Sequence, residues 1–330
     1  ALLFATLGLL TAASLAFSLL SGSIETGPGT LLAALTGSSD DVTRQILLEL
    51  RWPRTAAAFV TGALLALAGA LMQVLLRNPL ADPYVLGVSG GAALGGIAAL
   101  ALGGAFGLGY AAVPPAAFAG ALLATGGLVA VAGRAGRVDA TSLLLTGVVF
   151  NAIASAGIVF LASVAGLTEG ASIFLWLIGS LSATRGGVMI WVALFLAIGL
   201  AVAGPRARDL NLLALGEESA QQLGVDVGRQ QRALLLASSL MVGAAVAVAG
   251  LVGFVGLIIP HLLRLVLGAD HRLLVPASAL GGAIFLVLCD TAARTWLGGR
   301  ELPVGAITAL LGGPLFLWLL RRHYESRLAT

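Results

Sequence analysis

Long stretches without a charged residue most constrain what this chain can fold into. No charged side chain lies between Arg54 and Arg77, and none lies between Asp82 and Arg134. A helix that crosses a bilayer needs about 20 apolar residues, so each stretch can hold at least one span. Hydrophobic residues make up 59% of the chain and charged residues only 10%, whereas about 25% are charged in soluble domains. The sequence therefore predicts an all-α, polytopic membrane protein.

Charges, glycines and prolines divide this apolar sequence into ten predicted transmembrane helices. In chain order they are residues 2–21, 55–76, 85–103, 114–133, 141–164, 187–204, 231–252, 254–268, 275–293 and 302–320. We take residues 1–330 as one transmembrane domain. The apolar start is interpreted as the first span rather than a secretory signal, because no small-residue cleavage site follows it.

The arginines predict which side of the membrane each connection faces. With the N-terminus inside, twelve arginines lie on the cytoplasmic side, at positions 77, 134, 137, 206, 208, 229, 232, 264, 272, 321, 322 and 327. The other six lie outside, at positions 44, 51, 54, 185, 294 and 300. Because arginine is enriched on the cytoplasmic side of membrane proteins, this orientation is preferred.

Two similar segments predict an internal repeat. The sequence G-A-L-L-A-L-A-G-A at 62–70 matches G-A-A-V-A-V-A-G-L at 243–251, and the same offset superposes Pro79 on Pro260. The two copies run in opposite directions in the predicted topology, as in transporters built from inverted repeats. The repeat halves would cover about 51–164 and 231–320. Coincidence among helices rich in alanine and glycine is the alternative.

Several classes of site find no support in the sequence. The single cysteine, Cys289, allows neither an internal disulfide nor a thiolate cluster, and the three histidines form no metal-binding pair. Neither a catalytic motif nor a phosphate-binding G-x-x-x-x-G-K-[ST] loop occurs, and no basic run with aromatic residues suggests nucleic acid. We therefore predict no catalytic, cofactor or metal site in this chain; if ATP drives it, ATP and magnesium bind a separate subunit.

The most specific pattern lies between residues 51 and 91. It comprises Arg51, Pro53-Arg54, Gly62, Ala68-Gly69, Gln73, Asn78-Pro79-Leu80-Ala81, Pro83 and Leu86-Gly87-Val88-Ser89. This combination resembles the permease subunits of type II ABC importers, which bring in vitamin B12, ferric siderophores and haem. The resemblance extends from Arg44 to Arg321. It implies a homodimer in the inner (cytoplasmic) membrane that carries two ATP-binding cassette subunits and one external substrate-binding protein.

The longest polar interruption, residues 205–232, predicts two short amphipathic helices separated by glycine. Such helices can bury leucines in a groove of a partner. The resemblance makes this segment the cytoplasmic coupling loop that contacts the ATPase. Its predicted coupling residues are Leu213, Leu215, Gly216, Glu217, Glu218, Ala220, Leu223 and Gly224. An ordinary solvated loop is the alternative.

Outside the membrane, the resemblance implies that Arg51, Arg54 and Arg294 dock acidic groups of the binding protein. Guanidinium groups suit this role because they pair with carboxylates in a bidentate manner. Anchoring of helix ends at lipid headgroups is the alternative. Asp290 precedes Arg294 by one helical turn, which predicts a local ion pair that orients the arginine.

At the predicted cytoplasmic side, the resemblance places gates at two turns. Their residues are Asn78, Pro79, Leu80, Ala140 and Thr141. The alternative for the first turn is a simple helix stop.

Two further features remain open. Residues 170–183 are too short to span and resemble the family's short helix near the outer mouth, or else place Trp176 at the interface. His261 and Arg264 could relay protons, but helix packing is the simpler interpretation.

The sequence leaves the cargo open within the resembling family. A pathway without a ring of charge suits a bulky chelate held weakly. P-Y-V-L-G-V-S and the paired outer arginines fit several subgroups of the resembling family. They resemble the vitamin B12 type most, so the resemblance favours a corrinoid over a ferric siderophore or haem. The rival from another class is an ion-coupled secondary transporter. It predicts an ionisable residue in the middle of a span, and the sequence places none there securely.

Overall fold

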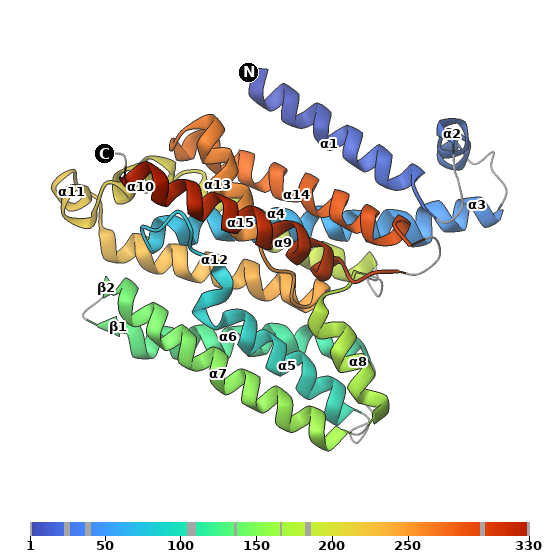
Figure 1. The fold of residues 1–330 in the computed structure, drawn as a ribbon, viewed down its shortest axis with the longest axis horizontal. Coiled ribbons are helices and arrows are strands. Elements are labelled where there is room, and N and C mark those ends of the chain that lie inside the picture. The colour runs from blue at the N-terminus through green and yellow to red at the C-terminus, as the bar shows by residue number, and fades with distance from the viewer. Residues whose placement is uncertain are drawn as a thin grey trace.

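Helices form almost all of the described chain in the computed structural model (Figure 1). The structure describes residues 2–22, 27–36, 41–103, 110–134, 137–165, 167–181, 186–297 and 301–328. Within them the one sheet is a two-residue antiparallel hairpin of β1 (Gly133–Arg134) with β2 (Arg137–Val138). The predicted all-α class is confirmed for these residues apart from that hairpin. Arg185 and Arg300, assigned to the outer side, lie outside the described residues.

The first half of the chain contains seven α-helices and three short turns of other helical types. They are α1 (Leu2–Leu20), α2 (Pro28–Thr36), α3 (Asp41–Gln45), η1 (Ile46–Arg51), α4 (Trp52–Leu75), η2 (Pro83–Leu86), α5 (Val88–Gly103), η3 (Tyr110–Ala112), α6 (Val113–Ala132) and α7 (Ala140–Ala165). The second half contains α8 (Leu167–Ile178), α9 (Gly186–Ala203), α10 (Ala207–Ala214), α11 (Glu217–Gln222), α12 (Val227–Ala249), α13 (Val255–Leu267), α14 (His271–Thr295) and α15 (Val304–Leu328).

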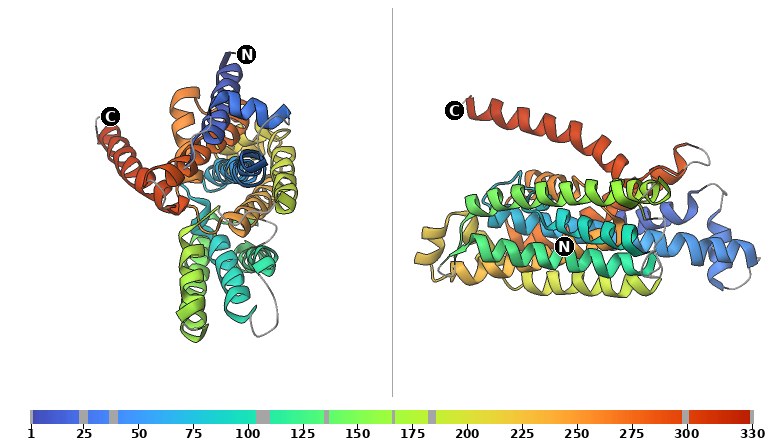
Figure 2. Two further views of the ribbon diagram at one scale, coloured as in Figure 1. Left: turned by 90° about the vertical axis from the view of Figure 1, so that its right-hand side faces the viewer. Right: turned by 90° about the horizontal axis from the view of Figure 1, so that it is seen from below.

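Helix α4 lies at the centre of the larger of two groups of helices, with α9, α12, α13 and α14 packed against it (Figure 2). Every residue from Thr61 to Leu76 is buried. Glycine makes this enclosure possible, because a Cβ atom on Gly62 would overlap the carbonyl group of Gly282 on α14. A Cβ atom on Gly69 would likewise overlap the backbone of Gly256 on α13. Close backbone approach at small residues is how helices associate in membranes.

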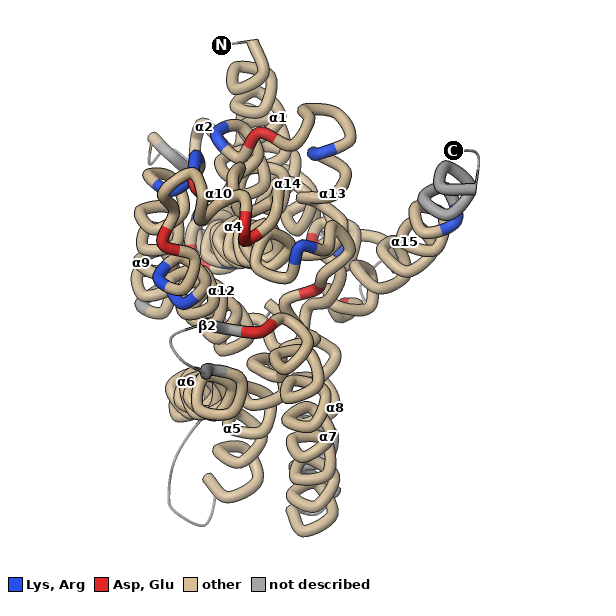
Figure 3. The backbone as a smooth tube through the Cα atoms, turned by 90° about the vertical axis from the view of Figure 1, so that its left-hand side faces the viewer, with Lys and Arg blue, Asp and Glu red and all other residues tan. Residues whose placement is uncertain are grey.

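The second group consists of α5, α6, α7 and α8 and lies beside the first (Figures 1 and 2). Helix α12 joins the groups, since it packs against both α4 and α6. Acidic and basic residues gather at the end of the molecule where α10, α12 and β2 meet, whereas α5, α6 and α7 are uncharged along most of their length (Figure 3). This distribution is expected where helix sides face lipid or other helices and helix ends face water.

Two breaks in the helices meet inside the molecule. The first, between α4 and α5, contains η2, and Gly87 at its end has a φ of 80°. The second, between α12 and α13, ends at Phe254, which has a φ of 69°. The amide of Val252 in the second break donates a hydrogen bond of 3.0 Å to the Tyr84 hydroxyl in the first. Tyr84 therefore ties the two breaks together.

Each of the ten predicted spans falls on one apolar helix, but not every helix is long enough to cross a bilayer alone. Seven described helices are long and apolar enough, and the pair α9 and α10, bent by 66°, makes up to eight. Helices α5 and α13 have only 16 and 13 residues. At 1.5 Å per residue they fall short of the ~30 Å hydrocarbon core. The chain is thus a multi-pass membrane protein, and the count of ten stays a prediction.

The two prolines that support the internal repeat, Pro79 and Pro260, do not occupy equivalent positions in the structure. Pro79 lies in the turn after α4, whereas Pro260 lies inside α13. The break between α12 and α13 is shorter than the break between α4 and α5, so a constant offset cannot align residues on both sides of it. The matching segments on α4 and α12 remain, and the inverted repeat stays a prediction.

Candidate functional site

The polar segment 205–232 folds as two short helices, α10 and α11, as its pattern predicts. Gly216 separates them with a φ of 125°, a conformation that glycine adopts without strain. Leu215 and Leu223 are 73% and 62% exposed, so they are free to contact a partner. Leu213 and Ala220 are instead buried within the chain. The expectation that Leu213 fills a groove of a partner is therefore wrong, because its side chain already packs inside this subunit.

Helix α10 is attached to the start of α14. The side-chain amide of Asn211 donates a hydrogen bond of 2.8 Å to Asp270, and its oxygen accepts one of 2.8 Å from the backbone amide of His271. Asp270 also caps α14 by accepting from Arg272. These hydrogen bonds lower the pKa of the Asp270 carboxyl group, and the bond from Asn211 has the largest effect. Asn211 was not among the predicted site residues, since only the fold brings it to Asp270.

Helix α11 is attached to the end of α4. Glu217 forms an ion pair of 3.0 Å with Arg77 and accepts a hydrogen bond of 3.2 Å from Gln231. Arg77 is the residue directly before the predicted gate turn, and its φ of 48° is unusual for a residue other than glycine. Glu218 is exposed. The predicted coupling and gate segments therefore touch each other through Arg77.

The two predicted gate turns lie at the same end of the molecule. Asn78 fixes the first turn by accepting a hydrogen bond of 2.9 Å from the Leu80 amide, and Pro79 and Leu80 are half-buried. At the second turn Ala140 is half-buried and Thr141 exposed.

Asp139 lies directly before this second turn. It caps α7 by accepting a hydrogen bond of 2.7 Å from Ser142. This contact, together with the nearby charge of Arg77, lowers the pKa of Asp139. Arg77 thus lies close to both predicted gate turns.

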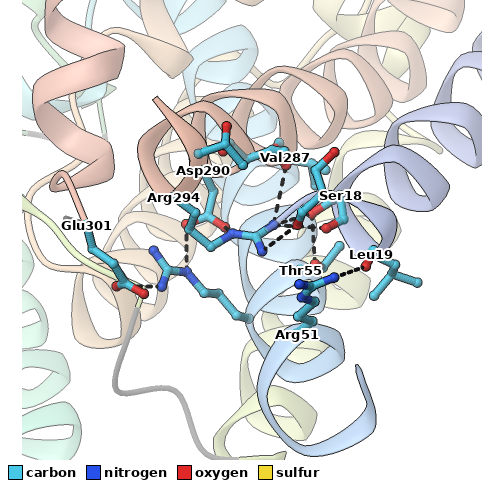
Figure 4. Close-up of polar contacts among 12 residues, drawn as sticks. Ser18, Leu19, Arg51, Thr55, Val287, Asp290, Arg294 and Glu301 are labelled. Carbon is cyan, nitrogen blue, oxygen red and sulfur yellow. Dashed lines mark hydrogen bonds and ion pairs between the residues drawn. The ribbon is translucent and has the colours of Figure 1, made fainter. Parts of the chain in front are cut away.

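The three predicted docking arginines lie at the opposite end of α4: Arg51 directly precedes this helix, Arg54 is in its first turn, and Arg294 shares Asp290 with Arg54. Figure 4 shows Arg51 and Arg294 in this cluster. The 24 residues of α4 separate the two ends by about 36 Å. Arg51 donates a hydrogen bond of 2.8 Å to the Leu19 carbonyl at the end of α1. Arg294 donates bonds of 2.8 and 3.1 Å to the side chain and carbonyl of Ser18. Both side chains therefore brace α1 against the rest of the chain.

Asp290 is the centre of this cluster (Figure 4). Its side chain is completely buried and forms ion pairs of 3.1 Å with Arg294 and 2.9 Å with Arg54. The predicted local pair with Arg294 is confirmed, and the pair with Arg54 was not predicted. Arg54 also forms an ion pair of 2.8 Å with Glu301, whose side chain is 58% exposed. The arginines are mostly buried and already paired, so any docking role uses the small part that reaches the surface.

The predicted short outer helix is α8, although residues 182 and 183 of that prediction lie outside the described residues. Trp176 on this helix is 6% exposed and packs against Gly96 of α5. It is therefore not an interfacial anchor, as the alternative interpretation supposed. Trp176 contributes to an apolar cavity of about 740 Å³, together with Tyr110, Phe118, Trp191 and Phe195.

Among the residues that the structure describes, the other histidine and cysteine side chains form no further site. His261 is buried within α13, and Cys289 is a buried free thiol in α14. Among the described residues, no group of three histidine, cysteine or acidic side chains could hold a metal ion.

Comparison with known proteins accounts for this arrangement. The model of the FecCD transport family matches residues 10–322. The chain belongs to the FecCD transport family. It is 43% identical to the hemin transport system permease protein HmuU of Yersinia pestis, over 88% of this chain and 87% of that protein. It is 45% identical to the cobalamin import system permease protein BtuC of Halobacterium salinarum, over 84% of this chain and 74% of that protein.

A solved structure supports the same assignment. An inward-facing ABC transporter described as of metal-chelate type superposes with a TM-score of 0.80 at 30% identity, covering 96% of this chain and 97% of the other. The PsaBC structure from Streptococcus pneumoniae shares the fold alone, with a TM-score of 0.56 at 18% identity. As a FecCD family member, the chain is a permease of a type II ABC importer.

Proposed function

We propose that this FecCD permease works as a homodimer in the cell's inner membrane and moves a bulky metal chelate inward. Two ATP-binding cassette subunits would bind α10 and α11, and one binding protein would deliver the cargo to the opposite end. The permease itself would undergo alternating access, with ATP and magnesium bound only by the partner. The observation that carries this proposal is the Glu217–Arg77 ion pair of 3.0 Å, because it connects an exposed coupling helix to the predicted gate turn.

The contacts support a route by which movement of α10 and α11 would reach α4 and α14. A partner that binds Leu215 and Leu223 would move α10 and α11 together, since only Leu215 and Gly216 lie between the two helices. The movement would reach α4 through Arg77 and α14 through Asn211 and Asp270. Both α4 and α14 run to the arginine cluster, since Arg54 is in the first turn of α4 and Arg294 is in the last turn of α14. Through them, the nucleotide state at one end would influence docking at the other.

For the cargo we propose a corrinoid such as vitamin B12, with haem and ferric siderophores as the alternatives. Relatives named for cobalamin and for hemin are 45% and 43% identical, and so similar a pair of values does not separate the two. The test is uptake into proteoliposomes that contain the permease and its ATPase. Labelled cobalamin, haem and ferric siderophore would each be supplied with the cognate binding protein. ATP-dependent accumulation of cobalamin alone would support the corrinoid assignment, and accumulation of another chelate would replace it.

The same vesicles test the rival class. An ion-coupled secondary transporter would accumulate cargo without the ATPase subunit when an ion gradient is imposed. An importer of the proposed kind would accumulate none under that condition. Uptake driven by a gradient alone would overturn the proposed function.

A further inference from the structure

Arg54 is paired with two carboxylates that differ sharply in exposure. Its Nε donates to Asp290, which is completely buried, and its Nη1 donates to Glu301, whose side chain is 58% exposed. The two carboxylates come from different elements, since Asp290 lies on α14 and Glu301 lies just before α15 (Figure 4). The buried carboxylate holds the arginine in place, whereas the exposed carboxylate covers its outer face.

Replacing these two carboxylates would have different costs. Asp290 also binds Arg294, so its removal would leave two largely buried arginines without their shared partner. Glu301 is mainly in water, where an ion pair contributes only about 0–1 kcal/mol. A carboxylate that arrives from outside could therefore displace Glu301 at little cost but could not displace Asp290.

We propose that Glu301 is an internal substitute for an acidic side chain of the binding protein. In the free permease Glu301 occupies Nη1 of Arg54, and on docking an aspartate or glutamate of the binding protein takes its place. The proposal rests on the proposed function, in which this end of the molecule receives the binding protein. Charge favours such a ligand, since the cluster formed by Arg51, Arg54, Arg294, Asp290 and Glu301 contains three positive and two negative side chains.

This exchange predicts the direction in which the affinity for the binding protein changes when Glu301 loses its charge. Glu301 competes with the binding protein, so removing its charge should strengthen docking. A merely structural Glu301, which positions Arg54 for the partner, would give the opposite result. From the strength of an exposed ion pair, Glu301→Gln is expected to lower the Kd of the complex by about two- to fivefold.

The test is surface plasmon resonance with the permease–ATPase complex in nanodiscs and the cognate binding protein immobilised. Glu49→Gln is the matched control, because Glu49 is exposed just before Arg51 and forms no ion pair among the described residues. Both variants raise the net charge by one, so a general electrostatic gain appears in both. The proposal predicts tighter binding for Glu301→Gln than for Glu49→Gln. Equal affinities, or weaker binding by Glu301→Gln, would overturn it.

A second variant separates this inference from the docking assignment. If Arg54 takes part in docking, Arg54→Gln weakens binding, and Glu301→Gln has no further effect in that background. If Arg54→Gln binds as wild type does, the docking role of Arg54 fails and the inference fails with it. If Arg54→Gln weakens binding while Glu301→Gln does not strengthen it, only the inference about Glu301 fails. Arg54→Lys, which retains the charge beside Asp290, replaces Arg54→Gln should that variant not fold.

Discussion

Asp290 and Arg54, 236 residues apart in the sequence, form an ion pair of 2.9 Å between α14 and α4. Asp290→Asn would remove the charge that balances both Arg54 and Arg294. Breaking a buried pair in this way typically costs about 3–5 kcal/mol. We expect the free energy of unfolding of Asp290→Asn to be lower than that of the wild type by this amount, as measured by denaturant titration of the purified permease. Glu301→Gln is the control, because it leaves Asp290 with both arginines; an equal loss in the two variants would contradict the central role of Asp290.

The contact between Gly62 and Gly282 gives a second prediction. Gly62→Val places atoms where the backbone of α14 already lies, so α4 and α14 must separate. Overpacking typically costs about 1–3 kcal/mol and more where backbone must move. We expect a lower melting temperature and less monodisperse protein by fluorescence-detected size exclusion. Gly126→Val on α6 is the control, since a Cβ atom there meets nothing within 4 Å; equal melting temperatures would argue against tight α4–α14 packing.

The local features of this fold could be predicted from the sequence because they depend on neighbouring residues. The charge-free runs predicted the apolar helices correctly, since each predicted span falls on one of them. The glycine in the polar segment 205–232 predicted the break between α10 and α11 at Gly216. The start of α14 at His271 was predicted four residues late, although Asp270 caps it with a hydrogen bond to Arg272. That aspartate was a readable signal for an earlier start.

The long-range features could not be predicted in this way. Arg54 contacts Asp290 and Arg77 contacts Glu217 only because helices distant in the sequence pack together. The spacing of these residues along the chain does not predict either ion pair. Leu213 and Leu215 looked alike as leucines of an amphipathic segment. Which of them faces its own subunit depends on how α10 packs against α14 and α4.

The ion pair between Arg77 and Glu217 predicts that charge, rather than residue identity, couples α11 to the end of α4. Arg77→Glu or Glu217→Arg should each lower the cargo moved per ATP hydrolysed, by up to about fivefold for a partly exposed pair. The double variant, which restores the pair in reverse, should recover coupling. Paired uptake and phosphate-release measurements in proteoliposomes check this.

Arg229→Glu provides the control for that experiment. Arg229 is exposed near the start of α12, and its side chain forms no ion pair among the described residues. It should change coupling little. A double variant no better than either single variant would remove the proposed link.

The exposed and buried leucines of the coupling segment should respond differently to the same change. Leu223→Asp, at a side chain that is 62% exposed, should alter the free energy of unfolding by less than about 0.5 kcal/mol. It should weaken ATPase binding about tenfold or more if Leu223 is buried on the partner. Leu213→Asp should instead destabilise the permease itself, because it buries a charge. Melting temperatures and pull-down of the ATPase separate the two effects, and identical behaviour of the variants would contradict the assignment of faces.

Asp82 predicts a dependence of stability on pH. Burial raises the pKa of its carboxyl group from 3.8 to about 6, although the amide of Tyr84 donates a hydrogen bond of 2.8 Å to it. A pKa that is higher in the folded state means that ionisation opposes folding, so this group should lower stability as the pH rises from about 4 to about 6. Asp82→Asn keeps an oxygen that can accept from Tyr84 but cannot ionise. The melting temperature of the variant should therefore exceed that of the wild type by a margin that grows from about pH 4 to about pH 6 and is constant above that. Parallel plots of melting temperature against pH would show that Asp82 ionises as it does in the unfolded chain.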